Sequence, residues 1–350
     1  MSFENGLIDL RSDTVTHPTP DMRRAMVNAA VGDDVFGEDP TVNRLQEVGA
    51  AMTGHAAGLF VASGTMGNLV ALLTHCGRGA EVIVGDKSHI YLTEVGGMAA
   101  LGGMQPYPLA NQPDGTLALD AVTLAVRAED VHHPRTRLVC LENTQNQCGG
   151  VALSADYTRQ VADLARARQL KLHLDGARLF DAAVAQGVEA RALSGPCDSV
   201  MVCLSKGLCA PVGSLLCGPA DFIAEARRNR KQVGGGMRQA GILAAAGLIA
   251  LQQMTGRLAE DHEHARRLAD GLRTVPGVEP DPGTAATNMV YFYLGRGARL
   301  NPAQLTEAMA KHGVLMTYDE VGHFRLVTHY WVNAQDVDKA VRLFREVLSA

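Results

Sequence analysis

The sequence predicts an α/β fold in which helices cover a mainly parallel sheet and a small α+β domain follows. From about residue 55 to 220, short apolar segments alternate with segments of helical periodicity, as expected for parallel strands joined by crossover helices. After two long helical segments, the pattern changes to short strands mixed with helices. A chain of 350 residues is long enough for two such domains. We therefore expect a large domain over residues 1–256 and a small domain over residues 257–350.

Each predicted strand of the large domain is a short apolar segment, which is typical of strands buried on both faces. The expected strands are Ala57–Val61, Glu81–Val84, Leu138–Glu142, Lys171–Leu174, Ser199–Leu204 and Ser214–Cys217. The expected helices are Gly67–His75, Ala155–Gln169 and Ala220–Lys231.

The rest of the chain begins with two long predicted helices, Ala240–Met254 and Leu258–Thr274. Shorter elements of both kinds follow, and together they predict the small α+β domain. The expected elements are the strands Asn288–Leu294, Val314–Met316 and Phe324–Val327 and the helices Pro302–His312 and Asp336–Leu348.

The composition is that of an ordinary globular protein, with 47% hydrophobic and 20% charged residues. A formal net charge of -5, with both signs spread along the chain, argues against a nucleic-acid or membrane surface. The N-terminus lacks the basic and then apolar order of a signal peptide, and the apolar stretch Ala240–Leu251 is too short to span a bilayer. Seven cysteines without Cys-x-x-Cys spacing favour the reducing cytoplasm.

Lys206 is the most informative residue, because a buried strand delivers it to a Ser-Lys-Gly corner. A desolvated lysine can act as a nucleophile toward a carbonyl. The alternative is a lysine at a strand end whose ammonium reaches solvent. The segment by itself leaves both readings open.

Asp175 ends another predicted strand, and Arg178 follows three residues later. A buried carboxylate is costly unless a cation meets it. That cation is either Arg178 itself, in a local ion pair, or a ligand group such as a protonated pyridine nitrogen. In the second case Arg178 is left to bind a carboxylate through two hydrogen bonds.

Two further segments follow predicted strands. Ser63-Gly64-Thr65 opens a helix, where backbone amides can bind a phosphate, although many loops carry such residues only as a helix cap. His89 lies just past a strand, where its ring can stack on a flat ligand or be an ordinary loop histidine. Taken together, a nucleophilic lysine, a pyridinium partner, a phosphate site, a stacking ring and a carboxylate-binding arginine predict pyridoxal 5'-phosphate acting on an amino acid.

Several longer motifs sharpen this prediction. They are Leu-Arg-Ser-Asp-Thr-Val-Thr (10–16), Val-Gly-Asp-Asp-Val-Phe-Gly-Glu-Asp-Pro-Thr-Val-Asn (31–43), Ser-Gly-Thr-Met-Gly-Asn (63–68), His-Leu-Asp-Gly-Ala-Arg-Leu-Phe (173–180), Cys-Leu-Ser-Lys-Gly-Leu (203–208), Gly-Gly-Gly-Met-Arg-Gln-Ala-Gly (234–241), Thr-Asn-Met-Val (287–290) and Arg-Leu-Val-Thr-His (325–329). In sequence and in order, they resemble the low-specificity L-threonine aldolase family of pyridoxal-phosphate-dependent lyases.

The resemblance implies a large domain of the aspartate-aminotransferase-like fold, known as PLP fold type I. It implies retro-aldol cleavage of L-threonine, L-allo-threonine and related L-β-hydroxy-α-amino acids to glycine and an aldehyde. The open alternatives are another lyase activity on the same cofactor, such as phenylserine cleavage or β-elimination, or transamination, racemisation or decarboxylation. A ligand-binding module without catalysis is a further alternative from a different class.

The resemblance also assigns roles to single residues. Lys206 matches the lysine that holds the cofactor covalently, Asp175 the partner of the pyridine nitrogen, and His89 the stacked ring. The phosphate ligands are matched by Gly64 and Thr65, the substrate carboxylate site by Ser12, Arg178 and Arg325, and the second histidine near the substrate hydroxyl by His132. Lys231 and Arg238 match residues that reach a neighbouring subunit's site, so we expect a homo-oligomer, a tetramer built as a dimer of dimers. The basic stretch that holds Lys231 would otherwise indicate a solvated helix face.

Two positions depart from the family's pattern. Phe36 stands where a tyrosine is usual, and Gln145 stands where a histidine is common. Glutamine can hydrogen-bond but cannot titrate near neutral pH. The base that removes the β-hydroxyl proton is left open between His89, His132 and a bound water, with His89 favoured. No metal ligand is predicted.

Overall fold

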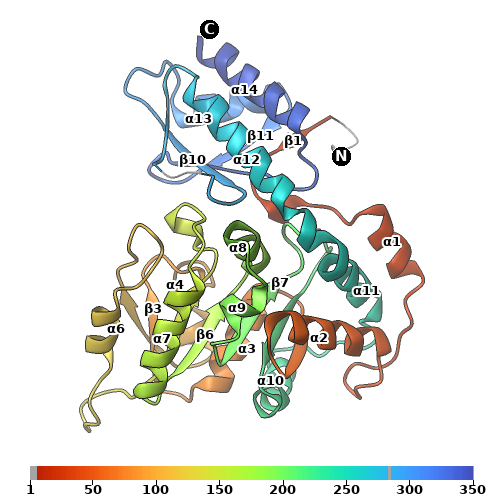
Figure 1. Cartoon of the computed structure of the whole chain (residues 1–350), viewed down its shortest axis with the longest axis vertical. Helices are drawn as coiled ribbons and strands as arrows, with labels where there is room; N and C mark the ends of the chain where they lie inside the picture. The colour runs from red at the N-terminus through yellow and green to blue at the C-terminus, as the bar shows by residue number, and fades with distance from the viewer. Residues whose placement is uncertain (1–5, 283–284, 350) are drawn as a thin grey trace. The chain divides into compact units, whose positions relative to one another are not determined.

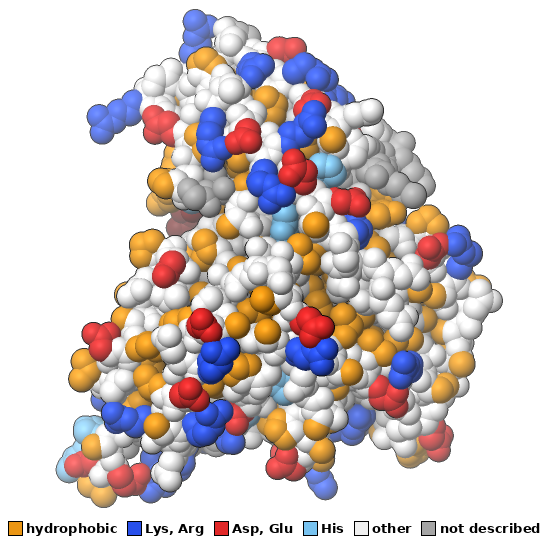
Figure 2. Space-filling view, in the orientation of Figure 1, with side chains coloured by type: hydrophobic (Ala, Val, Ile, Leu, Met, Phe, Trp, Pro, Cys, Tyr) orange, Lys and Arg blue, Asp and Glu red, His pale blue; other side chains and the backbone are white. Residues whose placement is uncertain are grey.

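The computed structural model describes residues 6–282 and 285–349. Its contacts divide the chain into two compact units. One unit spans Pro18–Thr255, and the other joins the segment that ends at His17 with the segment that begins at Gly256. The sequence had placed residues 1–17 with the predicted large domain, and that division into a catalytic and a small domain stays a prediction. On the face drawn in Figure 2, acidic and basic side chains are interspersed.

A seven-stranded sheet forms the centre of the unit Pro18–Thr255, and its strands β3, β6 and β7 are labelled in Figure 1. The sheet is mainly parallel, as predicted: β8 alone pairs antiparallel, with β7 on one side and β2 on the other. The strand order is β2-β8-β7-β6-β5-β3-β4. The strands are β2 (Ala57–Val61), β3 (Glu81–Gly85), β4 (Gln105–Leu109), β5 (Thr136–Glu142), β6 (Lys171–Asp175), β7 (Ser199–Cys203) and β8 (Ser214–Gly218).

The register brings several strand ends to one edge of this sheet. Glu142 pairs with Asp175, and Asp175 with Met201, so β5, β6 and β7 end close together. Ser214 pairs with both Val61 and Cys203. Because β8 is antiparallel to both neighbours, β2 and β7 run in the same direction and end at this same edge. Ligands collect outside the carboxyl ends of such strands.

Helices cover both faces of the sheet, and the side-chain alternation of β2 shows how. Leu59 and Val61 pack against Val70 of helix α3 and Ile223 of helix α10 on one face. Gly58 points to the other face, where a Cβ would lie 2.7 Å from the carbonyl oxygen of Gln46 in α2. The helices of this unit are α1 (Pro20–Val27), α2 (Pro40–Thr53), α3 (Gly64–His75), α4 (His89–Leu92), α5 (Gly97–Ala100), α6 (Leu119–Ala125), α7 (Ala155–Ala167), α8 (Leu179–Gln186), α9 (Ala190–Ser194), α10 (Ala220–Gln232) and α11 (Gly241–Ile249).

The other unit is a small α+β structure, as predicted for most of its length. Its four-stranded sheet is antiparallel, in the order β12-β13-β10-β9. A two-residue strand near the N-terminus, β1 (Ile8–Asp9), pairs parallel with β11 (Val314–Leu315). The remaining elements are α12 (Leu258–Arg273), β9 (Val278–Pro280), β10 (Met289–Leu294), α13 (Pro302–Lys311), β12 (Thr317–Tyr318), β13 (Phe324–Val327) and α14 (Ala334–Ser349).

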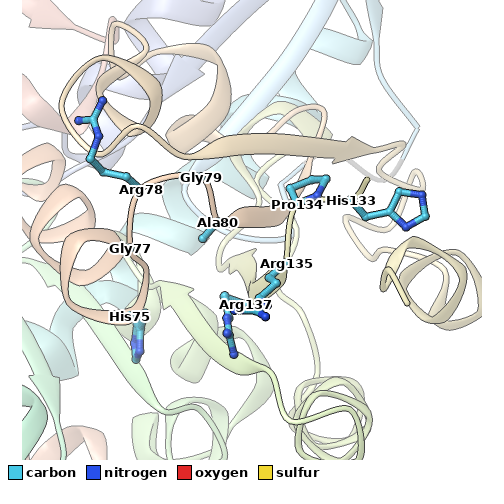
Figure 3. A pocket seen from close by; sticks show the side chains of 9 residues that line it. All are labelled: His75, Gly77, Arg78, Gly79, Ala80, His133, Pro134, Arg135 and Arg137. Atoms are coloured by element: carbon cyan, nitrogen blue, oxygen red, sulfur yellow. The ribbon is translucent and has the colours of Figure 1, made fainter. Parts of the chain in front are cut away.

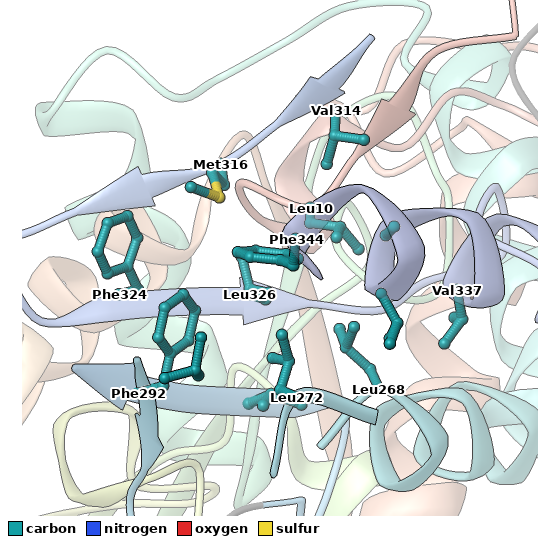
Figure 4. Packing of buried hydrophobic residues seen from close by; sticks show 14 of the residues in the cluster. Leu10, Leu268, Leu272, Phe292, Val314, Met316, Phe324, Leu326, Val337 and Phe344 are labelled. Atoms are coloured by element: carbon teal, nitrogen blue, oxygen red, sulfur yellow. The ribbon is translucent and has the colours of Figure 1, made fainter. Parts of the chain in front are cut away.

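Aromatic rings from two strands and one helix form the centre of this unit's core (Figure 4). Phe292 and Phe324 stack with ring centroids 4.6 Å apart, and Phe344 of α14 meets Phe292 edge-on at 5.7 Å. Leu10, which follows β1, is buried in the same cluster. This burial explains why the first residues belong to this unit.

One helical segment, Gly241–Arg273, is long and apolar enough to cross a membrane by length and composition alone. Of its most apolar window, 44% is buried inside the structure. Ala244, Ala245 and Ala246 in its first part are all buried. A core helix of a globular protein passes the same test, and this burial favours that reading.

Candidate active site

Lys206 lies in a tight turn after β7, at the edge where the strands end. The turn is closed by two backbone hydrogen bonds, from Cys209 N to the Lys206 carbonyl (2.9 Å) and from Leu204 N to the Gly213 carbonyl (3.0 Å). The Lys206 side chain is half-buried. Its charge acts on the pKa values of both His89 and Cys203, which places the ammonium among the strand ends.

Asp175 ends β6 and is only 2% exposed. Its Oδ1 accepts a hydrogen bond from Ala177 N (3.1 Å), and its Oδ2 accepts one from Asn68 Nδ2 (2.9 Å). Both donors are neutral amides, so they leave the negative charge of the carboxylate in place. A buried carboxylate held this way is suited to meet a ligand cation.

The start of α3 offers the predicted phosphate site. Ser63 caps the helix by accepting a hydrogen bond from Met66 N (3.1 Å). The backbone approaches Cys203 closely here, because a Cβ on Gly64 would lie 2.9 Å from the Cys203 sulfur. Ser63 and Thr65 are exposed. A twelve-residue helix whose first residues are exposed or half-buried next to Cys203 is well placed to bind an anion.

His89 begins α4 and is held at two points. Its backbone N–H donates to Glu142 (2.6 Å), and its Nδ1 lies 2.9 Å from Glu94 Oε1. Because a carboxylate only accepts, Nδ1 carries the proton and donates it. The hydrogen bond to Glu94 raises the pKa of His89, burial opposes this, and Asp175 raises it further while Lys206 lowers it. Lys206, Asp175 and His89 therefore lie within electrostatic reach of one another.

Three site residues were missed from the sequence: Asn68, Glu94 and Glu142. Glu142 ends β5 as Asp175 ends β6, and that shared position was the available signal. Burial raises the pKa of Glu142 to about 7, and the adjacent Asp175 adds to the shift. Burial also raises the pKa of Glu94. Asn68 is the last residue of the motif 63–68, but no role was assigned to it from the sequence, and it lies inside α3.

His89, Glu94 and Asp175 also form a group that resembles a metal site. Their potential ligand atoms lie within 4.8 Å of one another. Hydrogen bonds account for this arrangement, because Asn68 Nδ2 donates to both Glu94 (2.8 Å) and Asp175 (2.9 Å) and His89 donates to Glu94. We therefore assign no metal ion to the group.

Comparison with known proteins decides the family. A family model described as Beta-eliminating lyase matches residues 9–294. The low specificity L-threonine aldolase of Escherichia coli (strain K12) is 47% identical over 98% of this chain and 100% of its own length. Low-specificity L-threonine aldolase 1 of Arabidopsis thaliana is 45% identical over 97% of this chain and 96% of its own. The chain belongs to the low-specificity L-threonine aldolase family.

Solved structures support the same fold. A threonine aldolase from Leishmania major matches with a TM-score of 0.80 at 20% identity, covering 97% of this chain and 99% of that chain. A serine palmitoyltransferase from Sphingomonas wittichii matches with a TM-score of 0.78 at 18% identity, covering 98% and 88%. At these identities the likeness shows the fold alone, and it confirms the predicted fold type.

Among the residues assigned by family resemblance, Arg178 is buried at the start of α8, three residues after Asp175. Ser12 and Arg325 both belong to the smaller unit. There Arg325 Nη2 donates to the carbonyl of Arg11 (3.4 Å), the residue next to Ser12. The structure thus brings Ser12 and Arg325 close to each other, and their role toward the substrate stays a prediction.

Of the three remaining residues, only His132 lies away from the strand ends that carry Lys206. Lys231 follows Arg230, whose Nη1 donates to the Phe60 carbonyl (2.7 Å) near the end of β2. His132 precedes β5, so it lies toward the opposite edge of the sheet, where its side chain is 84% exposed and contacts Asp130. Lys231 is exposed in the last turn of α10. Arg238 is exposed and pairs with Asp33 (2.9 Å). Their roles stay predictions.

The two departures from the family's pattern have different surroundings. Gln145 is buried and both ends of its amide bind backbone, with Nε2 donating to Lys87 O (3.0 Å) and Oε1 accepting from Cys148 N (2.8 Å). Phe36 is 73% exposed. Gln145 therefore holds its own loop in place, and this function does not require a titrating side chain.

A basic pocket lies at the opposite edge of the sheet, where β3 and β5 begin (Figure 3). No carboxylate of the described chain lines it. None of the predicted site residues lines it either. Its lining residues are His75, Gly77, Arg78, Gly79, Ala80, His133, Pro134, Arg135 and Arg137.

Proposed function

We propose that this chain is a pyridoxal-phosphate-dependent lyase that cleaves L-threonine and L-allo-threonine to glycine and acetaldehyde. Related L-β-hydroxy-α-amino acids would give glycine and the corresponding aldehyde. The observation that carries this proposal is the meeting of Lys206, Asp175 and His89 at one sheet edge. The chain is also 45–47% identical, over nearly its full length, to aldolases of that name.

The residues present fit pyridoxal phosphate. Lys206 would hold it covalently, Asp175 would face its pyridine nitrogen, and the His89 ring would stack on it. Gly64 and Thr65 at the start of α3 would bind its phosphate. When bound, the cofactor accepts the electron pair of the breaking Cα–Cβ bond.

Arg178 is proposed to bind the substrate carboxylate, and the same role is proposed for Ser12 and Arg325. Guanidinium groups bind carboxylates through two parallel hydrogen bonds, which fixes the orientation of the amino acid. That orientation decides which bond at the α-carbon breaks. Carbon–carbon cleavage, rather than proton loss or decarboxylation, then follows from how these residues hold the substrate.

His89 is the proposed base for the β-hydroxyl proton. Since Nδ1 donates its proton to Glu94, a neutral His89 ring has its lone pair on Nε2. That nitrogen can accept the substrate's proton while Glu94 steadies the resulting charge. We expect His89→Asn to lower kcat by about 100-fold or more and His132→Phe to lower it less. Near-full activity of His89→Asn would leave the role to His132 or a bound water.

The active oligomer is proposed to be a tetramer built as a dimer of dimers, with sites shared between subunits. The exposure of Lys231, Arg238 and His132 supports this, because exposed side chains can reach another copy.

The cytoplasm is the proposed compartment. None of the seven cysteines forms a disulfide in the described chain, which fits a reducing environment.

A product assay tests the function directly. Purified protein is incubated with L-threonine and, separately, with L-allo-threonine, and glycine and acetaldehyde are quantified beside ammonia and α-keto acid. Equal amounts of glycine and acetaldehyde are expected, with none from D-threonine, and Lys206→Ala should lose turnover. Ammonia with α-keto acid in place of acetaldehyde would instead show β-elimination. A colourless protein that leaves both substrates intact would overturn the proposal.

A further inference from the structure

A continuous chain of buried polar groups leads from the proposed cofactor site to the far edge of the sheet. Asp175 accepts from Asn68, and Asn68 Oδ1 lies 3.1 Å from His173 Nε2. His173 Nδ1 lies 2.8 Å from Ser199 Oγ, which in turn lies 2.7 Å from His75 Nε2. Asn68, His173 and Ser199 are each at most 1% exposed.

The strand pattern explains why these groups meet. His173 and Asp175 alternate with Leu172 and Leu174 in β6, so the polar pair shares one face of the sheet. Ser199 lies beside His173 in the neighbouring strand β7. Asn68 of α3 contacts both polar residues of β6, so this face lies under α3. Polar residues inside a strand that is otherwise apolar call for an explanation other than packing.

The donor and the acceptor of every hydrogen bond in this chain of polar groups follow from the orientation of Asn68, at the end nearest the proposed cofactor site. Asn68 must present its NH₂ group to Glu94 and Asp175, because its oxygen would repel two carboxylates. Its oxygen therefore accepts, and His173 must carry its proton on Nε2. Burial lowers the pKa of His173 to about 3, so the ring is neutral and its Nδ1 accepts from the Ser199 hydroxyl. Ser199 then accepts from the Nε2 proton of His75.

All donors thus point toward the carboxylates. At the inner end, one amide group of Asn68 bridges Asp175 and Glu94. Asp175 is the proposed pyridine partner, and Glu94 holds the proposed base His89. At the outer end, His75 lines the basic pocket of Figure 3. Since burial lowers the pKa of His75 to about 4, this ring too is neutral at working pH.

We propose that Asn68 is a positioning residue that links Asp175, the proposed pyridine partner, to Glu94, which holds the proposed base His89. In this proposal, His173 and Ser199 fix the orientation of the Asn68 amide. This inference rests on the proposed function. It goes beyond that function by assigning a role to three residues that would act through Asp175 and Glu94. A hydrogen bond to a charged group is worth about 10–100-fold in a rate when it is used in the reaction.

The test compares substitutions at His173 that either keep or interrupt this chain of hydrogen bonds. His173→Gln keeps the chain's direction, because its NH₂ can donate to Asn68 and its oxygen can accept from Ser199. His173→Leu fills similar space without either bond. Asn68→Ala removes the bridge itself. Asn229→Ala is the matched control, since it loses one half-buried hydrogen bond to Thr74 (3.0 Å) in the same unit.

Five quantities are measured on the purified holoenzyme: kcat, KM for L-threonine, the visible absorbance of the bound cofactor, its circular dichroism, and the melting temperature. Asn68→Ala and His173→Leu should lower kcat by about 10–100-fold and alter the cofactor's circular dichroism, with KM little changed. His173→Gln should restore most of both. Asn229→Ala should change the melting temperature alone.

The outcomes separate this inference from the proposed function. If the folded variants His173→Leu and His173→Gln have the same kcat and the same cofactor spectrum, the chain of hydrogen bonds has only a structural role and the inference fails. If Asn68→Ala loses melting temperature but keeps wild-type kcat and spectrum, it fails as well. A wild-type protein without cofactor absorbance, or without glycine and acetaldehyde as products, would refute the proposed function instead.

Discussion

At the scale of single residues, the His89–Glu94 contact decides where the site can take up a proton. The contact fixes the proton on Nδ1 and raises the pKa of the ring above its ordinary value of 6.5. His89 acts as a base only when it is neutral. The acid side of the pH–rate profile should therefore reflect this raised pKa.

Replacing Glu94 by glutamine tests that link. Without the carboxylate, burial dominates and the pKa of His89 falls, so its neutral form persists to lower pH. We expect the acid limb of kcat for Glu94→Gln to move to lower pH, with a smaller plateau because the positive charge is less well stabilised. An acid limb that stays in place, measured from pH 5 to 9, would contradict His89 as the titrating group.

Gly64 offers a second prediction at this scale. A Cβ there would lie 2.9 Å from the Cys203 sulfur and 3.2 Å from Met201 Cε, so Gly64→Ala must shift either these side chains or the start of α3. We expect the dissociation constant for pyridoxal phosphate to rise by about tenfold or more, equivalent to losing one charge-assisted hydrogen bond. Gly77→Ala is the control, since nothing lies within 4 Å of its Cβ position. Equal affinity of both variants would argue against this phosphate site.

At the scale of elements, Asp39 shows how a residue can be more than a helix cap. It caps α2 through Thr41 N (3.1 Å) and Val42 N (3.0 Å). The same buried carboxylate also accepts from Gly32 N (3.2 Å) and Gly241 N (2.8 Å). It thereby joins α2 to the preceding loop and to α11.

The cost of losing Asp39 should exceed that of losing an ordinary cap. Asp39→Ala leaves four N–H groups without their acceptor, so we expect the free energy of unfolding to fall by about 3 kcal/mol or more. Ser154→Ala, at the exposed cap of α7, should cost about 1 kcal/mol. Urea unfolding of both variants measures the difference, and equal losses would show that the extra contacts contribute little.

The elements that were predicted correctly share a clear local signal. β2 and β13 match their predicted limits, and other apolar strands differ by one or two residues. β4 was missed because Pro106 and Pro108 argue against a strand, yet as an edge strand it tolerates them. α2 was missed although Asp39 followed by Pro40 is a recognisable helix start.

At the scale of the whole molecule, the positions of Arg238 and His132 lead to a mixing experiment. If Arg238 serves a neighbouring site, chains lacking Lys206 and chains lacking Arg238 should complement each other. Random pairing of Lys206→Ala with Arg238→Ala should restore activity at about a quarter of all sites of a twofold dimer. The mixture is refolded or co-expressed, and its turnover is compared with that of each variant alone.

The control for mixing uses two residues of the same site. Lys206→Ala mixed with Asp175→Asn should stay inactive, because neither chain of a hybrid provides both groups. Mixing Lys206→Ala with His132→Phe tests in the same way whether His132 serves the site of a neighbouring subunit. Absence of recovery with Arg238→Ala would contradict a shared site.

The sequence by itself determined the sheet, the family and the residues that end its strands, because these depend on local apolar patterns and contiguous motifs. Lys206, Asp175 and His89 could be predicted since each lies at or just beyond the end of an apolar strand. Only the tertiary structure revealed Asn68, Glu94 and the direction of the donor chain to His75. Apart from the Glu94–His89 contact, their hydrogen bonds join residues 26 to 124 positions apart, and such pairings leave no periodic or local trace in a single sequence. Strand register and the packing of α3 on the sheet decide them.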